Sequence, residues 1–206
     1  MRKIPSLFVR EFENHTVKRC LDKFTEGCEW VINGEGYPTE KLDGTCCLIQ
    51  DYKLYKRYDA KQGKKPPKGA IPCQPEPDPI TTHWPHWVLV DRNKPEDKWY
   101  VKAFDRFLES AKEQNYDIPN NTYELIGPHF QSNPYNLEED EFRQHGDIIL
   151  SKVPRDYEGI KDYLCNHYME GIVFWSDLWG TKKCKIKRTD FGFDWNGSTE
   201  KQKKGI

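Results

Sequence analysis

Five short polar segments of this 206-residue chain carry side chains that could handle a phosphate group or a metal ion. In chain order they are residues 40–45 (EKLDGT), 56–57 (KR), 123–127 (YELIG), 170–174 (EGIVF) and 185–187 (KIK). A lysine is a nucleophile only when it is deprotonated, and burial or nearby positive charge favours that neutral form. The first segment contains Lys41, and the cations of the other segments could supply such a positive field.

Two glutamates and two further lysines complete this set. Glu124 and Glu170 each begin or lie within an apolar run, where an isolated carboxylate is costly and calls for a cation or a metal ion. Lys185 and Lys187 alternate with an isoleucine, so both point to the same face of a strand, which suits a polyphosphate. Each segment alone could occur by chance. All five in one small chain predict a phosphate-and-metal site around Lys41.

The elements that must position these side chains are mostly strands, with two helices. Turn residues near Asp51 divide two β-rich runs, which predicts a hairpin over residues 45–58. Helical stripes of aromatic and aliphatic residues predict helices over residues 95–114 and 157–169. Short apolar runs predict further strands at residues 28–33, 87–91, 122–126, 147–151, 171–175 and 184–188. We therefore expect an α+β fold.

Two segments lie outside this pattern. Residues 64–85 are rich in proline, which excludes a central strand or a helix and predicts a surface loop. Residues 196–206 are polar and rich in lysine, and we expect them to form a frayed tail.

The composition limits the class of partner. The net charge of −1 excludes a bulk polycation, so contact with a nucleic acid must use a local basic patch. Residues 53–68 and 182–188 are two such patches, and a solvated charged face is the alternative interpretation of both. No run approaches the roughly 18 apolar residues of a membrane span, and the N-terminus has no apolar signal region.

Cysteine usage points to a reducing environment. The chain has seven cysteines, an odd number, and no CxxC pair, which disfavours a disulfide framework or a zinc ribbon. We expect buried or incidental thiols in a soluble, cytoplasmic protein.

The order of the polar segments resembles the covalent nucleotidyltransferase superfamily of ATP-dependent DNA and RNA ligases and mRNA-capping guanylyltransferases. Its KxDG motif is similar to residues 41–44, its motif III glutamate to Glu124, its EG[IV]V motif to residues 170–173, and its KxK motif to residues 185–187. The stretches TEKLDGTCC and TYELIGPHF…NPY look most like the small vertebrate-type 5′–3′ RNA ligases and their viral and microbial relatives.

This resemblance implies a single adenylation domain over residues 1–195, ATP-grasp-like, with antiparallel sheets, flanking helices and no C-terminal OB domain. It implies ATP as substrate, Mg²⁺ (or Mn²⁺) as cofactor, and RNA ends as partners, with no membrane and no protein partner. Lys41 would form lysyl-AMP and pass AMP to an RNA 5′-phosphate. A 3′-hydroxyl would then displace AMP and seal the strand, as in RNA repair.

The resemblance also implies roles for residues around the nucleotide. Glu40 would help to hold the adenine edge, partly through its backbone. Asp43 would support the Lys41 loop, and Gly44 would give that loop backbone freedom. Arg57 would contact the ribose or the 5′-phosphate, and Glu124 would bind the ribose hydroxyl.

Further roles concern the phosphates, the metal and the base. Glu170 would bind the catalytic metal, with Glu124 as a second metal candidate. Lys185 and Lys187 would hold the α-phosphate and neutralise developing charge. Phe142 and His145 are the candidates for stacking on adenine, and an ordinary turn residue is the alternative interpretation of His145.

Two other functions stay open at this stage. A DNA ligase or a capping-type enzyme shares the motifs, and the nucleotide and the end that is joined would distinguish them. A non-catalytic nucleotide- or nucleic-acid-binding module could keep the fold, although intact lysines and glutamates at all the motif positions disfavour it.

Overall fold

The computed structural model describes residues 1–14, 16–79 and 81–196. They form two compact units, and each contains its own hydrophobic core. Unit 1 comprises residues 1–3 and 43–145, and unit 2 comprises residues 4–42 and 146–206 as far as these are described. The boundary between Leu42 and Asp43 therefore divides the KxDG segment.

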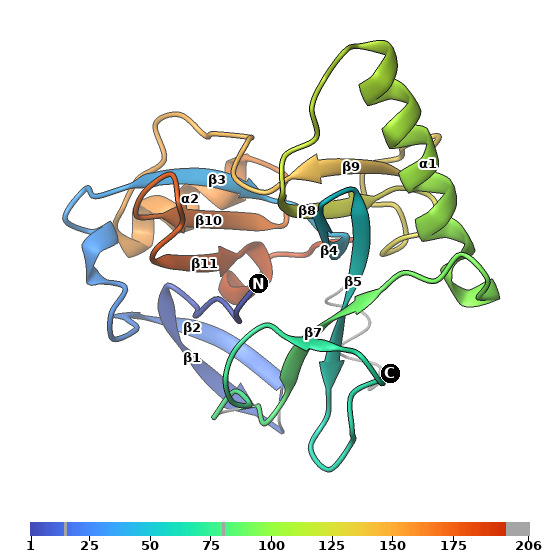
Figure 1. The fold of residues 1–206 in the computed structure, drawn as a ribbon. Coiled ribbons are helices and arrows are strands. Elements are labelled where there is room, and N and C mark those ends of the chain that lie inside the picture. The colour runs from blue at the N-terminus through green and yellow to red at the C-terminus, as the bar shows by residue number, and fades with distance from the viewer. Residues whose placement is uncertain (15, 80, 197–206) are drawn as a thin grey trace. The chain divides into compact units, whose positions relative to one another are not determined.

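Unit 1 is built on an antiparallel six-stranded sheet in the order β6-β7-β5-β4-β8-β9 (Figure 1). The strands are β4 (Thr45–Gln50), β5 (Lys53–Ala60), β6 (Ile71–Pro72), β7 (Trp84–Leu89), β8 (Asn121–Ile126) and β9 (Glu141–Gln144). The short 3-10 helix η2 (Pro95–Asp97) leads into α1 (Lys98–Glu113).

The two faces of this sheet differ in chemistry. Cys47, Tyr123, Leu125 and Phe142 share one face and form a core with the apolar side of α1. Because side chains alternate along a strand, the residues between them point to the opposite face. That face presents Cys46, Thr122 and Glu124, together with Arg57 from β5.

Unit 2 contains an antiparallel three-stranded sheet with β10 (Gly171–Trp175) between β3 (Tyr37–Lys41) and β11 (Lys183–Lys187) (Figure 1). The hairpin β1 (Phe8–Glu13) and β2 (Thr16–Phe24), the helix α2 (Tyr157–Asn166), and the 3-10 helices η1 (Glu29–Val31) and η3 (Arg188–Phe191) complete it. One face of the sheet buries Ile172, Phe174 and Ile186 against Ile160 and Leu164 of α2.

The predicted fold class, the two helices and the hairpin are confirmed. The class is α+β with antiparallel sheets, and α1 and α2 are the two α-helices within the described ranges. The hairpin turns at Asp51 and Tyr52, which have positive φ angles. The prediction that the proline-rich segment contains no central strand is wrong at its end, because Trp84 and Pro85 begin β7, which lies between β6 and β5; elsewhere among the described residues of the segment the two-residue β6 at the sheet edge is the strand present. No described helix is long and apolar enough to cross a bilayer.

Two predicted strands are wrong. The run at residues 28–33 contains the 3-10 helix η1, because a short apolar run does not distinguish a buried turn of helix from a strand. Residues 147–151 are irregular and form only an isolated bridge between Ile149 and Thr39. The sequence patterns also missed β1, β2, β3 and β9. The predicted tail at 196–206 lies, beyond residue 196, outside the described residues.

Candidate active site

Glu170 of unit 2 holds two of the predicted site lysines. Its Oε2 atom lies 2.5 Å from Lys41 Nζ, and its Oε1 atom lies 2.6 Å from Lys187 Nζ. The glutamate is only 3% exposed, so burial by itself would raise the pKa of its carboxyl. The ammonium groups of Lys41 and Lys187 outweigh that effect and hold the pKa below its ordinary value. Glu170 is therefore an ionised carboxylate that orients both lysines.

Strand register explains why these three side chains meet. Gly171 is opposite Lys41 on β3 and also opposite Lys187 on β11. Glu170 directly precedes this glycine, so its carboxylate lies between the ends of the two flanking strands. A Cβ atom on Gly171 would lie 2.2 Å from the carbonyl oxygen of Ile186, which is closer than any side chain permits. Only glycine lets β11 approach this position.

Lys185 lies two residues before Lys187, on the same face of β11. Burial lowers the pKa of Lys185 to about 7, and the positive charges of Lys41 and Lys187 act in the same direction. Arg10 adds a further positive charge, although it is itself paired with Asp190 at 2.8 Å. A lysine near half protonation at neutral pH can take up a proton when an anion binds beside it.

The same face carries one more lysine and an aromatic platform. Lys183 Nζ lies 3.7 Å from the centroid of the Trp175 ring, and Trp175 donates a hydrogen bond to Thr39 Oγ1 at 2.9 Å. Glu40 points to the opposite face, which packs on α2. Its charge contributes to the raised pKa of Tyr163 on that helix, after burial, which is the larger cause. Its backbone N–H donates to the carbonyl of Ile148 at 2.9 Å.

In unit 1, Glu124 is the centre of a second group of predicted site residues. Its Oε1 atom accepts a hydrogen bond from the backbone N–H of Gly44 at 3.0 Å, and its Oε2 atom lies 2.8 Å from His145 Nε2. A Cβ atom on Gly44 would lie 2.4 Å from the carbonyl oxygen of Leu125. This glycine therefore permits close approach of two strands. The adjacent Asp43 N–H donates to the Tyr135 hydroxyl at 2.7 Å.

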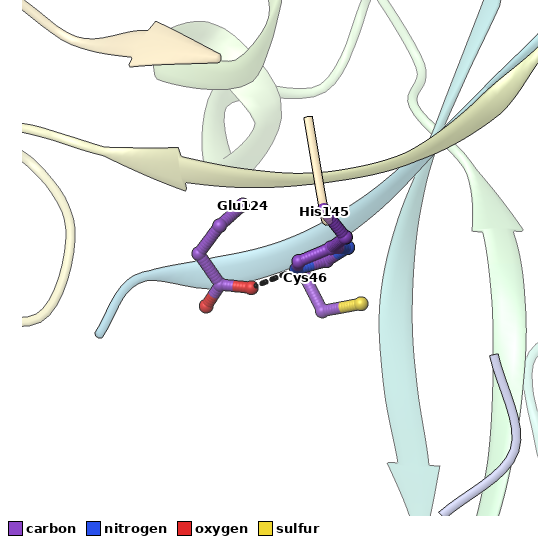
Figure 2. Close-up of side chains that lie close together, drawn as sticks. All are labelled: Cys46, Glu124 and His145. Carbon is purple, nitrogen blue, oxygen red and sulfur yellow. Dashed lines mark hydrogen bonds and ion pairs between the residues drawn. The ribbon is translucent and has the colours of Figure 1, made fainter. Parts of the chain in front are cut away.

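Cys46 is the cross-strand neighbour of Glu124, and Figure 2 shows its thiol beside the His145–Glu124 pair. Burial raises the pKa of Cys46 to about 12, and the charge of Glu124 contributes to the increase. The sulfur of Cys46, a carboxylate oxygen of Glu124 and a ring nitrogen of His145 all lie within 4.8 Å of one another. All seven cysteines of the chain are free thiols.

The basic segment on β5 divides between the two faces of the sheet. Lys56 points toward α1, where its ammonium contacts the buried carboxylate of Asp97. Arg57 lies on the face of Cys46 and pairs with Asp59 at 2.9 Å. Burial alone would lower the pKa of Arg57, but the charge of Asp59 and its hydrogen bond raise it. Lys56 therefore supports the fold, and Arg57 belongs to the polar face.

The two candidates for adenine stacking lie in different surroundings. Phe142 is buried in the α1 core, 5.4 Å from Phe107 between ring centroids, on the face opposite Glu124. His145 lies beside Glu124, and its Nδ1 atom is 3.0 Å from Thr122 Oγ1. Hydrogen-bonding groups thus occupy both of its ring nitrogens. The burial of Phe142 in the core does not support a role in adenine stacking. For His145, adenine stacking remains a prediction.

The predicted residues thus form one group in each unit. Unit 2 brings together Lys41, Glu170, Lys185 and Lys187. Unit 1 brings together Gly44, Glu124 and His145, with Arg57 on the same sheet face. The sequence patterns missed Cys46, Thr122, Tyr135 and Arg10. Cys46 could have been found only from the pairing of β4 with β8, because its own segment shows no ligand spacing.

A magnesium ion would fit unit 2 only as part of a mixed set of ligands. Glu170 supplies the oxygen chemistry that Mg²⁺ prefers, but each of its oxygens already contacts an ammonium group. Magnesium commonly keeps several waters and binds one or two carboxylates plus substrate phosphates. Glu170 fits such a role when phosphates provide the other ligands.

Comparison with known proteins finds similarity to two proteins named RNA ligase 1. No family model matches the chain. The chain is similar to RNA ligase 1 of Pongo abelii, with 26% identity over an alignment of 201 residues that covers 66% of this chain and 62% of the relative. It is also similar to RNA ligase 1 of Rattus norvegicus, with 27% identity over 209 residues covering 70% and 64% respectively. The chain thus spans less than two thirds of the length of these curated relatives.

Proposed function

We propose that this protein is an ATP-dependent RNA ligase that joins a 5′-phosphate end to a 3′-hydroxyl end through a lysyl-AMP on Lys41. The observation that carries the proposal is the contact of Lys41 and Lys187 with the two oxygens of the buried Glu170, beside Lys185. The similarity to two proteins named RNA ligase 1 supports RNA as the substrate class.

In the first step, the Nζ atom of Lys41 attacks the α-phosphorus of ATP, the bond to the bridging oxygen breaks, and diphosphate leaves. Lys41 must first lose a proton. The neighbouring charges of Lys185 and Lys187 favour the neutral amine, whereas Glu170 favours the ammonium form. An incoming triphosphate would compete with Glu170 for these cations, which would loosen the hold of the carboxylate on Lys41.

Lys185 and Lys187 would bind the oxygens of the α-phosphate. Charge on those oxygens rises toward the transition state, and fixed cations in a partly buried site stabilise it more than water does. With a pKa of about 7, Lys185 would arrive partly neutral and gain a proton as the phosphate binds. When bound, Mg²⁺ would supply further neutralisation of phosphate charge, with Glu170 as its protein ligand.

The residues of unit 1 enter the proposal through the family resemblance. Glu124 would bind a ribose hydroxyl, and Arg57 would contact the ribose or the RNA 5′-phosphate. In the second step the 5′-phosphate oxygen attacks the α-phosphorus of lysyl-AMP and frees Lys41. In the third step the 3′-hydroxyl oxygen attacks the RNA phosphate, AMP leaves, and the strand is sealed. RNA repair is the matching biological role.

The test is incubation with ATP labelled at the α-phosphate and Mg²⁺, followed by denaturation in detergent at neutral or alkaline pH. We expect label on the protein through an acid-labile but base-stable phosphoramide, and none on Lys41→Ala or Lys41→Arg. Addition of unlabelled 5′-phosphorylated RNA should move the label to RNA and then release AMP. Retention of label by Lys41→Ala would refute the assignment. Labelling by GTP, or transfer to DNA ends alone, would instead favour a capping-type enzyme or a DNA ligase.

A further inference from the structure

The polar face of the unit 1 sheet offers a second kind of site, with thiol, carboxylate and imidazole groups. From its geometry we infer that Cys46, Glu124 and His145 bind a thiophilic divalent transition-metal ion of the Zn²⁺ class. The ligands would be Cys46 Sγ, a carboxylate oxygen of Glu124 and Nε2 of His145 (Figure 2). Neither the lysyl-AMP chemistry nor the similarity to other proteins requires this site.

Three adjacent segments of the sheet hold the ligands. Cys46 and Glu124 are paired directly between β4 and β8, so their side chains emerge side by side on one face. His145 directly follows β9 and donates its backbone N–H to the carbonyl oxygen of Thr122 at 3.1 Å. Two ligands thus lie on strands, and the third is tied to a strand by a backbone hydrogen bond.

Two contacts outside the ligand set fix the orientation of the ligands. His145 Nδ1 lies 3.0 Å from Thr122 Oγ1, and Nε2 contacts Glu124. When a metal ion replaces the proton on Nε2, the tautomer that carries its proton on Nδ1 can donate it to Thr122 Oγ1. The backbone N–H of Gly44 donates to Glu124 Oε1 at 3.0 Å, which leaves Oε2 directed toward His145. Metal-binding histidines and carboxylates in proteins are commonly oriented by such contacts.

The distances suit a small tetrahedral ion after a modest adjustment. With bonds of about 2.0–2.3 Å, tetrahedral ligand atoms are separated by roughly 3.3–3.8 Å. Here one ligand atom from each of the three residues lies within 4.8 Å of the others, and His145 Nε2 lies 2.8 Å from Glu124 Oε2. For a tetrahedral site, the distance between these two atoms must increase slightly, and Cys46 Sγ must move closer to both. Three protein ligands leave a fourth position for water or another molecule, as in catalytic zinc sites.

The donor set also selects the metal. A thiolate and an imidazole favour zinc and its neighbours, whereas Mg²⁺ prefers oxygen ligands alone. Binding would exchange the Cys46 thiol proton, released to solvent, for the metal ion. The thiolate and the Glu124 carboxylate then balance the two positive charges of the ion. This charge balance suits a face that already carries Arg57.

One consequence rests on the proposed function. Glu124 cannot bind the ribose hydroxyl while it binds a zinc ion, so a metal ion in this site would inhibit adenylation of Lys41. Regulation by a thiophilic metal would then act through a residue of the nucleotide site.

The binding test uses the untagged full chain and Co²⁺ or Zn²⁺ without nucleotide. We expect one equivalent of Co²⁺ to give a thiolate-to-cobalt charge-transfer absorption and Zn²⁺ to displace it. Cys46→Ser should abolish that absorption, and His145→Gln should weaken zinc binding at least tenfold. Thr122→Val, which removes only the hydroxyl beside Nδ1, should weaken binding by about 10–100-fold. Cys165→Ser is the matched control, because Cys165 is an exposed thiol elsewhere in the chain, and it should bind like the parent.

Unchanged cobalt absorption in Cys46→Ser, or its loss in Cys165→Ser, would overturn the site. Circular dichroism of each variant shows whether a loss of binding reflects loss of folding, and Thr122→Val provides a mild variant if Cys46→Ser misfolds. The adenylation assay is scored separately. If the protein binds no metal but Lys41 is still adenylated by ATP, the metal site is rejected and the proposed function stands. Metal binding without inhibition of labelling rejects the competition with ribose.

Discussion

Lys41 and Lys187 lie on the two strands that flank β10, yet they contact the two oxygens of a single carboxylate, that of Glu170. Because β10 pairs with both neighbours at Gly171, the backbone ladder fixes the spacing of the two lysines. Paired strands restrict the positions of the side chains in a site more closely than loops do. For the proposed chemistry, this places the nucleophile and a phosphate-binding cation in one fixed group.

We predict that Lys187→Ala slows adenylation of Lys41 by about 10²–10³-fold, because a fixed cation is lost where charge develops on the α-phosphate. Single-turnover labelling with saturating ATP measures the rate of this step. The matched control is Lys182→Ala, which removes an exposed lysine close by in the chain and should change the rate by no more than a few-fold. Equal losses in both variants would argue for a general electrostatic effect in place of a specific contact.

Local sequence patterns predicted more of the candidate site than did long-range strand pairing. Lys185 and Lys187 were correctly expected on one strand face, because alternation along a strand is a local property. The partner of Glu170 was expected to be a cation or a metal, since a buried carboxylate is costly. Which cations bind it depends on the register among β3, β10 and β11, and β3 was not predicted. Long-range register leaves little trace in one sequence.

The same limit explains the residues that were missed. Cys46 has a proposed role only because β4 pairs with β8 and brings it beside Glu124. Phe142 was considered for adenine stacking because it lies between two motifs, but its register with Leu125 directs it into the α1 core. Residues 28–33 show a different limit: their apolar run fits a buried turn of helix as well as a strand. Periodicity cannot decide between the two over so few residues.

Gly171→Ala tests the close approach of β11 to β10. We expect the variant to lose about 1–3 kcal/mol of unfolding free energy, the usual range for an overpacked position, because the new methyl would meet the Ile186 carbonyl. It should also reduce labelling of Lys41, since the two lysines would separate. Urea unfolding gives the stability. Gly34→Ala is the comparison, because the space around Gly34 is open and only its positive φ opposes the change, at a cost of about 1–2 kcal/mol. A smaller loss for Gly171→Ala than for Gly34→Ala would contradict the packing explanation.

Lys185 should make stability depend on pH above neutrality. Its pKa is about 7 in the folded protein and near its ordinary value of 10.5 when unfolded. Between these values the unfolded chain binds more protons, so this group makes unfolding free energy rise with pH, by at most about 1.4 kcal/mol per pH unit. Below pH 7 both states are protonated, and the penalty for burying the charge is fully present.

Lys185→Met keeps the length of the side chain and removes its titration. We therefore expect the variant to gain most stability over the parent near pH 6, and to lose that advantage as the pH rises through 7 toward 10. Urea unfolding of both proteins across this range measures the difference, with Lys182→Met as the control for an exposed lysine. A difference between Lys185→Met and the parent that stays constant with pH would show that Lys185 is not buried as a partly neutral amine.

The basic segment at residues 53–68 offers a test of how the protein binds RNA. Lys56 is engaged with Asp97 and Arg57 with Asp59, whereas Lys61, Lys64 and Lys65 are exposed on or next to the proline-rich segment. If the three exposed lysines contact phosphates, Lys61→Ala/Lys64→Ala/Lys65→Ala weakens RNA binding. It also reduces the slope of log affinity against log salt by about 2, or roughly 0.7 per contact on a single strand. Titration of fluorescent single-stranded RNA at several salt concentrations measures both quantities.

The control for that experiment is a triple variant of two exposed lysines on β2 and a half-buried lysine on α2 of unit 2, Lys18→Ala/Lys23→Ala/Lys161→Ala. It makes the same change in net charge, so a purely long-range effect would weaken binding equally in both variants. A specific patch predicts a larger loss of slope for the variant at 61–65, with labelling of Lys41 by ATP unchanged in both. Equal slopes for the two variants would place the RNA contact elsewhere, and Lys182 together with Lys183, which lies over the Trp175 ring, would be the next positions to change.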